Sequence, residues 1–194
     1  MSNIFPIFDT LIARNEFEQF LGQKGQVLWI VGQSGSGKST IAAMLQRKLF
    51  EKGKYVIVLD GDNLRSGLNS GLGFSTEDRL ENIRRAAEVS KLLVQNGAIV
   101  LACFVCPLEI MRDKAKEILG EDYSEVYVKT SLETLIKRDT KGFYKKALEG
   151  KMEHLTGVNS EFEEPTHPDI LIDTDNMSIE ASVDLILKRM FLDI

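Results

Sequence analysis

The stretch QVLWIVGQSGSGKST, residues 26–40, carries the strongest structural signal in the chain. An apolar run leads into the pattern G-x-x-x-x-G-K-[S/T], which between a strand and a helix predicts a phosphate-binding loop. Glycine lets the backbone turn so that several N–H groups face phosphate oxygens, and the following helix directs its positive end to the same point. Lys38 is expected to reach the β- and γ-phosphates and Ser39 to bind Mg²⁺. The residues predicted to bind ATP in this loop are Gly32, Gln33, Ser34, Gly35, Ser36, Gly37, Lys38, Ser39 and Thr40.

Further runs rich in Val, Ile and Leu occur at residues 55–60, 98–104, 124–130 and 169–174. They are nearly continuous rather than alternating, which is typical of strands buried on both faces. Helical patterns between and after them predict helices over residues 39–52, 76–96, 107–119, 132–138 and 178–191. This order predicts an α/β fold, a P-loop NTPase-like three-layer sandwich with a five-stranded parallel sheet. We expect residues 25–194 to form one domain and residues 1–24 to form an arm with a short helix over residues 14–21.

One connection, residues 139–168, is long and polar. It carries lysines at positions 141, 145, 146 and 151 and glycines at 142, 150 and 157, with few apolar residues to anchor it. Connections of this length in compact domains are usually functional or mobile, so we expect a mobile, cationic lid. The alternative is a surface excursion without a role.

Composition excludes several classes of protein. The 194 residues carry a formal net charge of −5, whereas general nucleic-acid binders and membrane-surface proteins usually carry a basic excess. The longest apolar run, which begins at Ala98, is too short to cross a bilayer, and the first residues show no signal-peptide pattern. We therefore expect a cytoplasmic protein without nucleic-acid or membrane partners.

A second cluster of polar residues follows the apolar run that ends at Asp60. Asp60 and Asp62, at the carboxyl end of a strand, suit Mg²⁺ and a substrate hydroxyl. Arg79 and Asn82 share a face in the first two turns of a predicted helix, near the end that favours anions. An arginine fork binds tetrahedral oxyanions, and the nearby ring of Phe74 suits stacking on a planar base.

This second cluster, with Arg65 close by in the sequence, predicts a small, anionic and nucleotide-like acceptor. The alternative is a solvated helix surface carrying paired charges, which contribute little energy. We expect that arrangement for Arg84 and Glu88, and an anion site for Arg79 and Asn82.

Three segments resemble adenylylsulfate kinases: DGDNLRSGLN at residues 60–69, GFSTEDRLENIRR at residues 73–85 and KGFYKKA at residues 141–147. The similarity extends over residues 25–174 and also includes LGQKGQVLW and TGVNSEFEEP. Enzymes of this family phosphorylate the 3′-hydroxyl of adenosine 5′-phosphosulfate (APS) with MgATP and give PAPS. The resemblance implies this activity, a P-loop kinase fold and a homodimer. A separate ATP sulfurylase is then the expected pathway neighbour.

The resemblance also implies roles for individual residues. Lys38, Asp60 and Asp62 would be catalytic, with Ser39 and Asp60 at Mg²⁺ and Asp62 at the acceptor hydroxyl. The residues implied to lie at the substrates are Arg138 and Thr174 for the adenine of ATP, and Asp62, Arg65, Phe74, Arg79, Asn82, Val105, Cys106, Lys141 and Leu155 for APS.

Two positions depart from the family pattern. Cys106 stands where the family has a serine that has been proposed to carry phosphate transiently, so we expect direct in-line transfer here. Leu155 stands where many members have phenylalanine, and a leucine contributes less to base binding than a stacked ring.

Other functions are weighed against this one. A switch GTPase is disfavoured because the chain has no N-K-x-D motif. A kinase of the same architecture that acts on a related nucleotide, such as a cytidine diphosphoramidate, needs the same arginine site and stays open. A regulatory module that binds nucleotide without catalysis would have no need for both Asp60 and Asp62, and is disfavoured for that reason.

Overall fold

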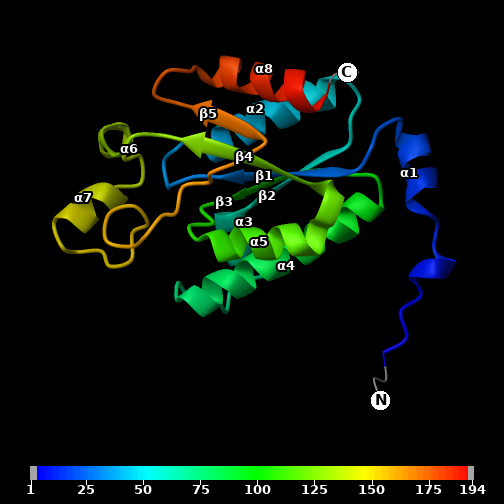
Figure 1. Ribbon diagram of the computed structural model, residues 1–194, viewed down its shortest axis with the longest axis horizontal. Helices are drawn as coiled ribbons and strands as arrows, with labels where there is room; N and C mark the ends of the chain where they lie inside the picture. Colours follow the sequence, from blue (N-terminus) through cyan, green and yellow to red (C-terminus); the bar gives the residue numbers. More distant parts are fainter. Residues whose placement is uncertain (1–3, 192–194) are drawn as a thin grey trace.

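The computed structural model describes residues 4–191, which fold around a five-stranded parallel sheet with helices on both faces (Figure 1). The strand order is β2-β3-β1-β4-β5, and every neighbouring pair is parallel. The predicted three-layer α/β fold with a five-stranded parallel sheet is therefore confirmed. The strands are β1 (Gln26–Val31), β2 (Val56–Asp60), β3 (Ile99–Phe104), β4 (Tyr123–Lys129) and β5 (Ile170–Asp173).

Helices α2 and α8 cover one face of the sheet, and α4 and α5 cover the other (Figure 1). The helices and strands expected from the sequence agree with the observed ones to within two residues at each end. The short helices α3 and α7 were not predicted. Within residues 4–191, no helix combines the length and the apolar character that crossing a membrane requires. The helices are α1 (Arg14–Leu21), α2 (Lys38–Glu51), α3 (Gly61–Arg65), α4 (Thr76–Gln95), α5 (Glu109–Leu119), α6 (Leu132–Arg138), α7 (Phe143–Leu148) and α8 (Ile179–Met190), with short 3₁₀ helices at Phe8–Thr10 and Gly120–Asp122.

The central strand β1 shows why the strands read as continuous apolar runs. Val27, Trp29 and Val31 point into a core shared with α4 and α5, whereas Leu28 and Ile30 point into a core shared with α2 and α8. Successive side chains of a strand point to opposite faces, so a strand covered on both faces must be apolar at every position. The sandwich thus fixes the carboxyl ends of the strands, where the polar loops of the sequence follow.

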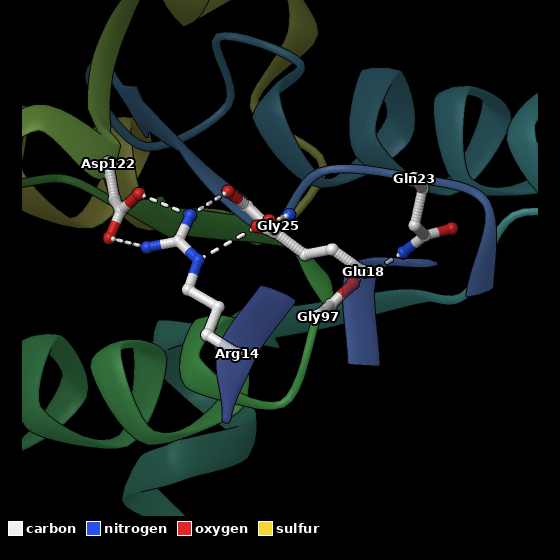
Figure 2. Close-up of polar contacts among 6 residues, drawn as sticks. All are labelled: Arg14, Glu18, Gln23, Gly25, Gly97 and Asp122. Carbon is white, nitrogen blue, oxygen red and sulfur yellow. Dashed lines mark hydrogen bonds and ion pairs between the residues drawn. The ribbon is translucent and has the colours of Figure 1, made fainter. Parts of the chain in front are cut away.

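Helix α1 is fastened to the opposite, amino-terminal end of the sheet (Figure 2). The guanidinium group of Arg14 donates to both carboxylate oxygens of Asp122 over 2.7 and 2.8 Å and to the carbonyl oxygen of Gly25 over 2.7 Å. Glu18 accepts from the N–H of Gly25 over 2.9 Å. Gly25 precedes β1 and Asp122 precedes β4, so these bonds hold the short helix away from the phosphate-binding loop.

The connection at residues 139–168 packs with α6 around a small apolar core, which we call the third cluster. It consists of Leu135, Tyr144, Ala147 and Leu155, with partly buried neighbours packed against it. The prediction that few apolar residues anchor this segment was therefore wrong, because α6 and α7 pack on each other and on the chain that follows.

Candidate active site

The phosphate-binding loop joins β1 to α2 at the carboxyl end of the central strand. Residues 34–40 line a cavity of about 460 Å³, which we call the first cavity. Gly32 and Gln33 precede this lining, and Gly32 is buried where a Cβ would overlap the carbonyl oxygen of Val128. The residues that line the first cavity are Ser34, Gly35, Ser36, Gly37, Lys38, Ser39, Thr40, Asp60, Gly61, Asp62, Cys103, Phe104, Val105, Arg138, Thr140, Lys141, Thr174, Met177, Ile179 and Ser182.

Lys38 is the buried cation of the first cavity, with only 9% of its surface exposed. Its ammonium group donates to the carbonyl oxygens of Gly32 and Gln33, each over 2.8 Å. Burial lowers the pKa of Lys38 to about 8, because removal from water disfavours the charged form. A phosphate in the cavity would give this ammonium group a negatively charged partner.

Asp60 holds the hydroxyl of Ser39 and the start of α3 together. Ser39 Oγ donates to Asp60 Oδ2 over 2.7 Å, and the N–H of Asp62 donates to Asp60 Oδ1 over 3.0 Å. Among residues 4–191, no group of three or more His, Cys, Asp or Glu side chains is placed to hold a metal ion. The carboxylate of Asp60 and the hydroxyl of Ser39 are the oxygen donors here that could contribute to a cation site.

Arg138 and Thr174, which the resemblance implied for the adenine of ATP, are bonded to each other and line the first cavity. Arg138 donates to the carbonyl oxygen of Thr174 over 2.8 Å and to its hydroxyl over 3.1 Å. Met177, Ile179 and Ser182 line the same cavity and were not predicted. The segment DTDNMSI after the last strand was the available signal, but its residue types do not by themselves indicate a binding role.

A second cavity of about 100 Å³ adjoins the first. All the residues implied for APS line it except Lys141, which lines the first cavity, and Leu155. The residues that line the second cavity are Gly61, Asp62, Arg65, Phe74, Arg79, Asn82, Ile83, Phe104, Val105, Cys106, Pro107 and Met111.

Two arginines flank the ring of Phe74 at this cavity. The guanidinium carbon lies 4.5 Å from the ring centroid for Arg65 and 5.6 Å for Arg79. Arg65 donates to the carbonyl oxygens of Leu72 and Gly73, and Arg79 donates to that of Phe74 over 2.9 Å. Burial lowers the pKa of both arginines, and the charge of Arg65 lowers the pKa of Arg79 further. In the described chain, no carboxylate is bonded to either arginine. Two cations that lie this close together make a site for an anion.

Asn82 presents a donor to the second cavity. The side chain is 5% exposed, and its Oδ1 accepts from Asn69 Nδ2 over 2.9 Å. The oxygen of Asn82 already accepts one hydrogen bond, and its NH₂ group is the part that can donate to an anion. Asn69 is fully buried and was not predicted to have a role.

The two cavities meet at one wall. Gly61, Asp62, Phe104 and Val105 line both of them. Lys141 reaches across from the connection at residues 139–168 and pairs with the carboxylate of Asp62. A phosphate-binding cavity thus opens onto a cationic cavity beside a carboxylate, which is the arrangement that phosphoryl transfer to a hydroxyl needs.

Comparison with known proteins agrees with this geometry. The sequence model of the family described as "Adenylylsulphate kinase" matches residues 24–173. This chain belongs to the adenylylsulfate kinase family. The adenylyl-sulfate kinases of Phocaeicola vulgatus and Bacteroides thetaiotaomicron are 50% and 48% identical to it, over 96% and 97% of this chain and 92% and 94% of their own. The structure of Mycobacterium tuberculosis APS kinase CysC in complex with AMPPNP and APS aligns with a TM-score of 0.83 and 41% identity, over 87% of this chain and 98% of that one.

The contact of Leu155 with APS, which the adenylylsulfate kinase pattern implied, stays a prediction. The side chain of Leu155 is 5% exposed and packs in the third cluster with Leu135 and Tyr144. It lines neither cavity. The structure gives this leucine a buried, apolar environment against α6 and α7.

Arg84 forms a different ion pair from the one expected. It contacts Glu81 over 2.7 Å, and Arg85 contacts the same carboxylate over 2.7 Å. The expectation of an ion pair with Glu88 was wrong, whereas the expectation that Arg84 belongs to a charged helix surface holds. This surface lies apart from the second cavity, since Arg84 does not line it.

Cys106 occupies the family's serine position as a buried thiol. It is 3% exposed, has a φ of +43°, and accepts a hydrogen bond at its carbonyl oxygen from Arg112 over 3.3 Å. Burial raises the pKa of Cys106 to about 12. The thiol therefore stays protonated near neutral pH, and a thiol is a poor nucleophile compared with a thiolate.

Proposed function

We propose that this protein transfers the γ-phosphoryl group of ATP to the 3′-hydroxyl of APS and releases ADP and PAPS. The observation that carries the proposal is the shared wall of the two cavities at Asp62 and Val105. A donor nucleotide in the first cavity and an acceptor nucleotide in the second would bring their reacting atoms to this wall, where holding two reactants in line supplies much of the catalysis.

The first cavity would hold ATP through the backbone N–H groups of the loop and through Lys38. On binding, the ammonium group would exchange the carbonyl oxygens of Gly32 and Gln33 for phosphate oxygens. The hydroxyl of Ser39 and the carboxylate of Asp60 are oxygen donors of the type that Mg²⁺ prefers, and bound Mg²⁺ would neutralise charge on the transferred group. Arg138 and Thr174 would lie at the adenine.

At the shared wall, Asp62 would accept the proton of the acceptor hydroxyl. The 3′-oxygen forms a bond to the γ-phosphorus, the bond from that phosphorus to the β–γ bridging oxygen breaks, and the proton moves to the Asp62 carboxylate. Lys141 would leave its ion pair with Asp62 and contact phosphate or APS. Cys106 is buried as a neutral thiol, so it would not carry the phosphate. The phosphoryl group would pass directly from ATP to the acceptor.

The second cavity would hold APS by charge and by stacking. Arg79 and the NH₂ group of Asn82 would donate to the phosphosulfate, and Phe74 would stack on the adenine with Arg65 behind it. A related nucleotide with a similar anionic tail could use the same groups. Turnover measured with APS and with a cytidine diphosphoramidate at equal concentrations decides between them: we expect turnover with APS, and preference for the cytidine compound would contradict the proposal.

The connection at residues 139–168 is proposed to close over the substrates through its outer part, which carries Lys141. Loops that close on phosphates gain their order from ligand contacts. Trypsin cleavage after Lys141 should slow when ADP and APS are both present, and equal cleavage with and without them would count against a lid. The homodimer, the cytoplasmic location and the separate ATP sulfurylase stay predictions from the sequence.

A further inference from the structure

Tyr144 belongs to α7, yet its hydroxyl contacts the phosphate-binding loop. The hydroxyl donates to the carbonyl oxygen of Ser34 over 2.7 Å, across 110 residues of sequence. The ring is 1% exposed and packs with Leu135 and Leu155 in the third cluster. Buried tyrosine hydroxyls usually find a hydrogen-bond partner, but this partner is part of the ATP site.

Three successive carbonyl groups at the start of the loop are held by hydrogen bonds. Lys38 donates to the carbonyl oxygens of Gly32 and Gln33, and Tyr144 donates to that of Ser34. A carbonyl oxygen carries partial negative charge, so the oxygen of Ser34 would repel a phosphate if it turned into the cavity. Of these three oxygens, that of Ser34 is bonded by a side chain from outside the loop.

The direction of the Ser34 carbonyl fixes the direction of the next N–H group. The chain from residue 4 to residue 191 contains no cis peptide, and in a planar trans peptide the C=O and N–H bonds point in opposite directions. With its oxygen bonded to Tyr144, this peptide directs the N–H of Gly35 away from the third cluster. Gly35 lines the first cavity, and a Cβ on it would meet Leu135 at 3.7 Å and Tyr144 at 3.9 Å.

A second contact joins the same connection to the same part of the loop. Gly157 lies against the side chain of Gln33, and a Cβ on Gly157 would overlap the amide group of Gln33. The loop is thus supported at Gln33 and at Ser34 by residues of the connection. The contact at Gln33 is made to a side chain. The contact at Ser34 is made to a backbone peptide, and the N–H group of that peptide belongs to Gly35, which lines the first cavity.

We propose that Tyr144 is a positioning residue, which orients the Ser34–Gly35 peptide so that the N–H of Gly35 donates to a phosphate of bound ATP. The inference rests on the ATP site proposed above. The connection at residues 139–168 would then contribute to nucleotide binding through the buried Tyr144, independently of the exposed Lys141. Affinity for the phosphate chain should depend on the Tyr144 hydroxyl, whereas affinity for the acceptor should not.

The test is Tyr144→Phe, which removes the hydroxyl and keeps the ring. Calorimetric titration of the full chain with Mg²⁺ and inorganic pyrophosphate, and separately with Mg²⁺ and ADP, should show affinities lower by about 2- to 12-fold, the range that one hydrogen bond contributes. Affinity for APS should be unchanged. Pyrophosphate affinity equal to that of the unsubstituted chain overturns the proposal.

Two controls separate positioning from general stability. Tyr123→Phe removes a phenol that donates to Glu125 over 3.2 Å. Neither residue lines the first or the second cavity, so this change should leave pyrophosphate affinity unchanged. Val158→Ala loosens packing against the third cluster, so it should lower the melting temperature and leave pyrophosphate affinity unchanged. If Val158→Ala weakens pyrophosphate binding as much as Tyr144→Phe does, the hydroxyl has no specific role.

A further measurement needs no substitution and serves if Tyr144→Phe does not fold. In the unsubstituted chain labelled with ¹⁵N, the amide proton of Gly35 should move downfield when pyrophosphate is added, because a new hydrogen bond deshields it. A Gly35 amide that does not respond overturns the proposal. A chain that shows this response but does not phosphorylate APS would contradict the proposed function alone.

Discussion

Lys141 and Asp62 form an ion pair between two segments that lie 79 residues apart in the sequence. Asp62 belongs to the wall shared by the two cavities, and Lys141 lines the first of them. The pair therefore spans the place where the acceptor hydroxyl must approach the γ-phosphoryl group. Both side chains are more than half exposed, at 51% for Lys141 and 75% for Asp62, so substrates can separate them at little cost.

Asp60 and Asp62 should contribute to catalysis in different ways, Asp60 through Mg²⁺ and Asp62 at the acceptor hydroxyl. Asp60→Asn and Asp62→Asn should both lower kcat more than ATP affinity, and loss of a general base alone costs about 10²- to 10⁴-fold. Because Asp60 is bonded to Ser39 at the expected Mg²⁺ position, raised Mg²⁺ should partly restore Asp60→Asn and not Asp62→Asn. A Mg²⁺ titration of kcat on each variant checks this, and the opposite pattern would mean that the two roles are exchanged.

The fold was predictable because its determinants are local. The central strands β1 and β3 are covered on both faces and are apolar at nearly every position. The spacing of glycines and Lys38 after β1 specifies the loop. The helices α3 and α7 escaped prediction because they have only five and six residues. Segments of five or six residues are too short to show a helical period, and these two owe their form to packing and to hydrogen bonds at their ends.

The site was predictable where neighbours in sequence act together, as with Arg79 and Asn82 on one helix face. Contacts between distant segments were not predictable. The bond from Tyr144 to Ser34 and the bond from Asn69 to Asn82 depend on how the elements pack. Leu155 illustrates the limit, since a leucine at a binding position and a leucine in a small core look the same in a sequence.

Arg79 should matter for the acceptor and not for the donor. Arg79→Ala should lower APS affinity by about 10- to 150-fold, the value of a charge-assisted contact that is partly buried, with ADP affinity nearly unchanged. Arg79→Lys should recover only part of this loss, because an ammonium group cannot bond two oxygens in a fork. Calorimetric titration with ADP and then with APS measures both affinities.

Arg84→Ala is the matched control for Arg79→Ala. Arg84 is on the same helix, but it pairs with Glu81 and its side chain is 43% exposed. We expect APS affinity close to that of the unsubstituted chain. A larger loss from Arg84→Ala than from Arg79→Ala would place the acceptor on the other face of α4.

Cys106 should be unreactive in the folded protein. Since burial raises the pKa of its thiol to about 12, the thiolate fraction at pH 8 is very small, and it grows about tenfold for each further pH unit. Mass spectrometry after iodoacetamide treatment should find Cys106 unmodified at pH 8 and modified once urea unfolds the chain. Phosphate on Cys106 after incubation with ATP alone would contradict direct transfer.

Lys38→Ala should abolish turnover and leave the fold intact. The ammonium group would stabilise charge on the transferred phosphoryl group, and removal of one such group in other enzymes costs about 10²- to 10³-fold in kcat. Circular dichroism should show an unchanged helix content, because the ammonium group of Lys38 bonds only to loop carbonyl oxygens among the described residues. A correctly folded variant with near-normal kcat would contradict the assignment of the first cavity to ATP.

The central claim is that ATP and APS react across the wall shared by the two cavities. The most direct test is the release of ADP by the purified chain with MgATP, in the presence and in the absence of APS, together with the mass of the nucleotide product. We predict that ADP appears only with APS and in equal amount to PAPS phosphorylated at the 3′-position. ADP release at the same rate without APS, or no reaction of APS while ATP is bound, would contradict the account.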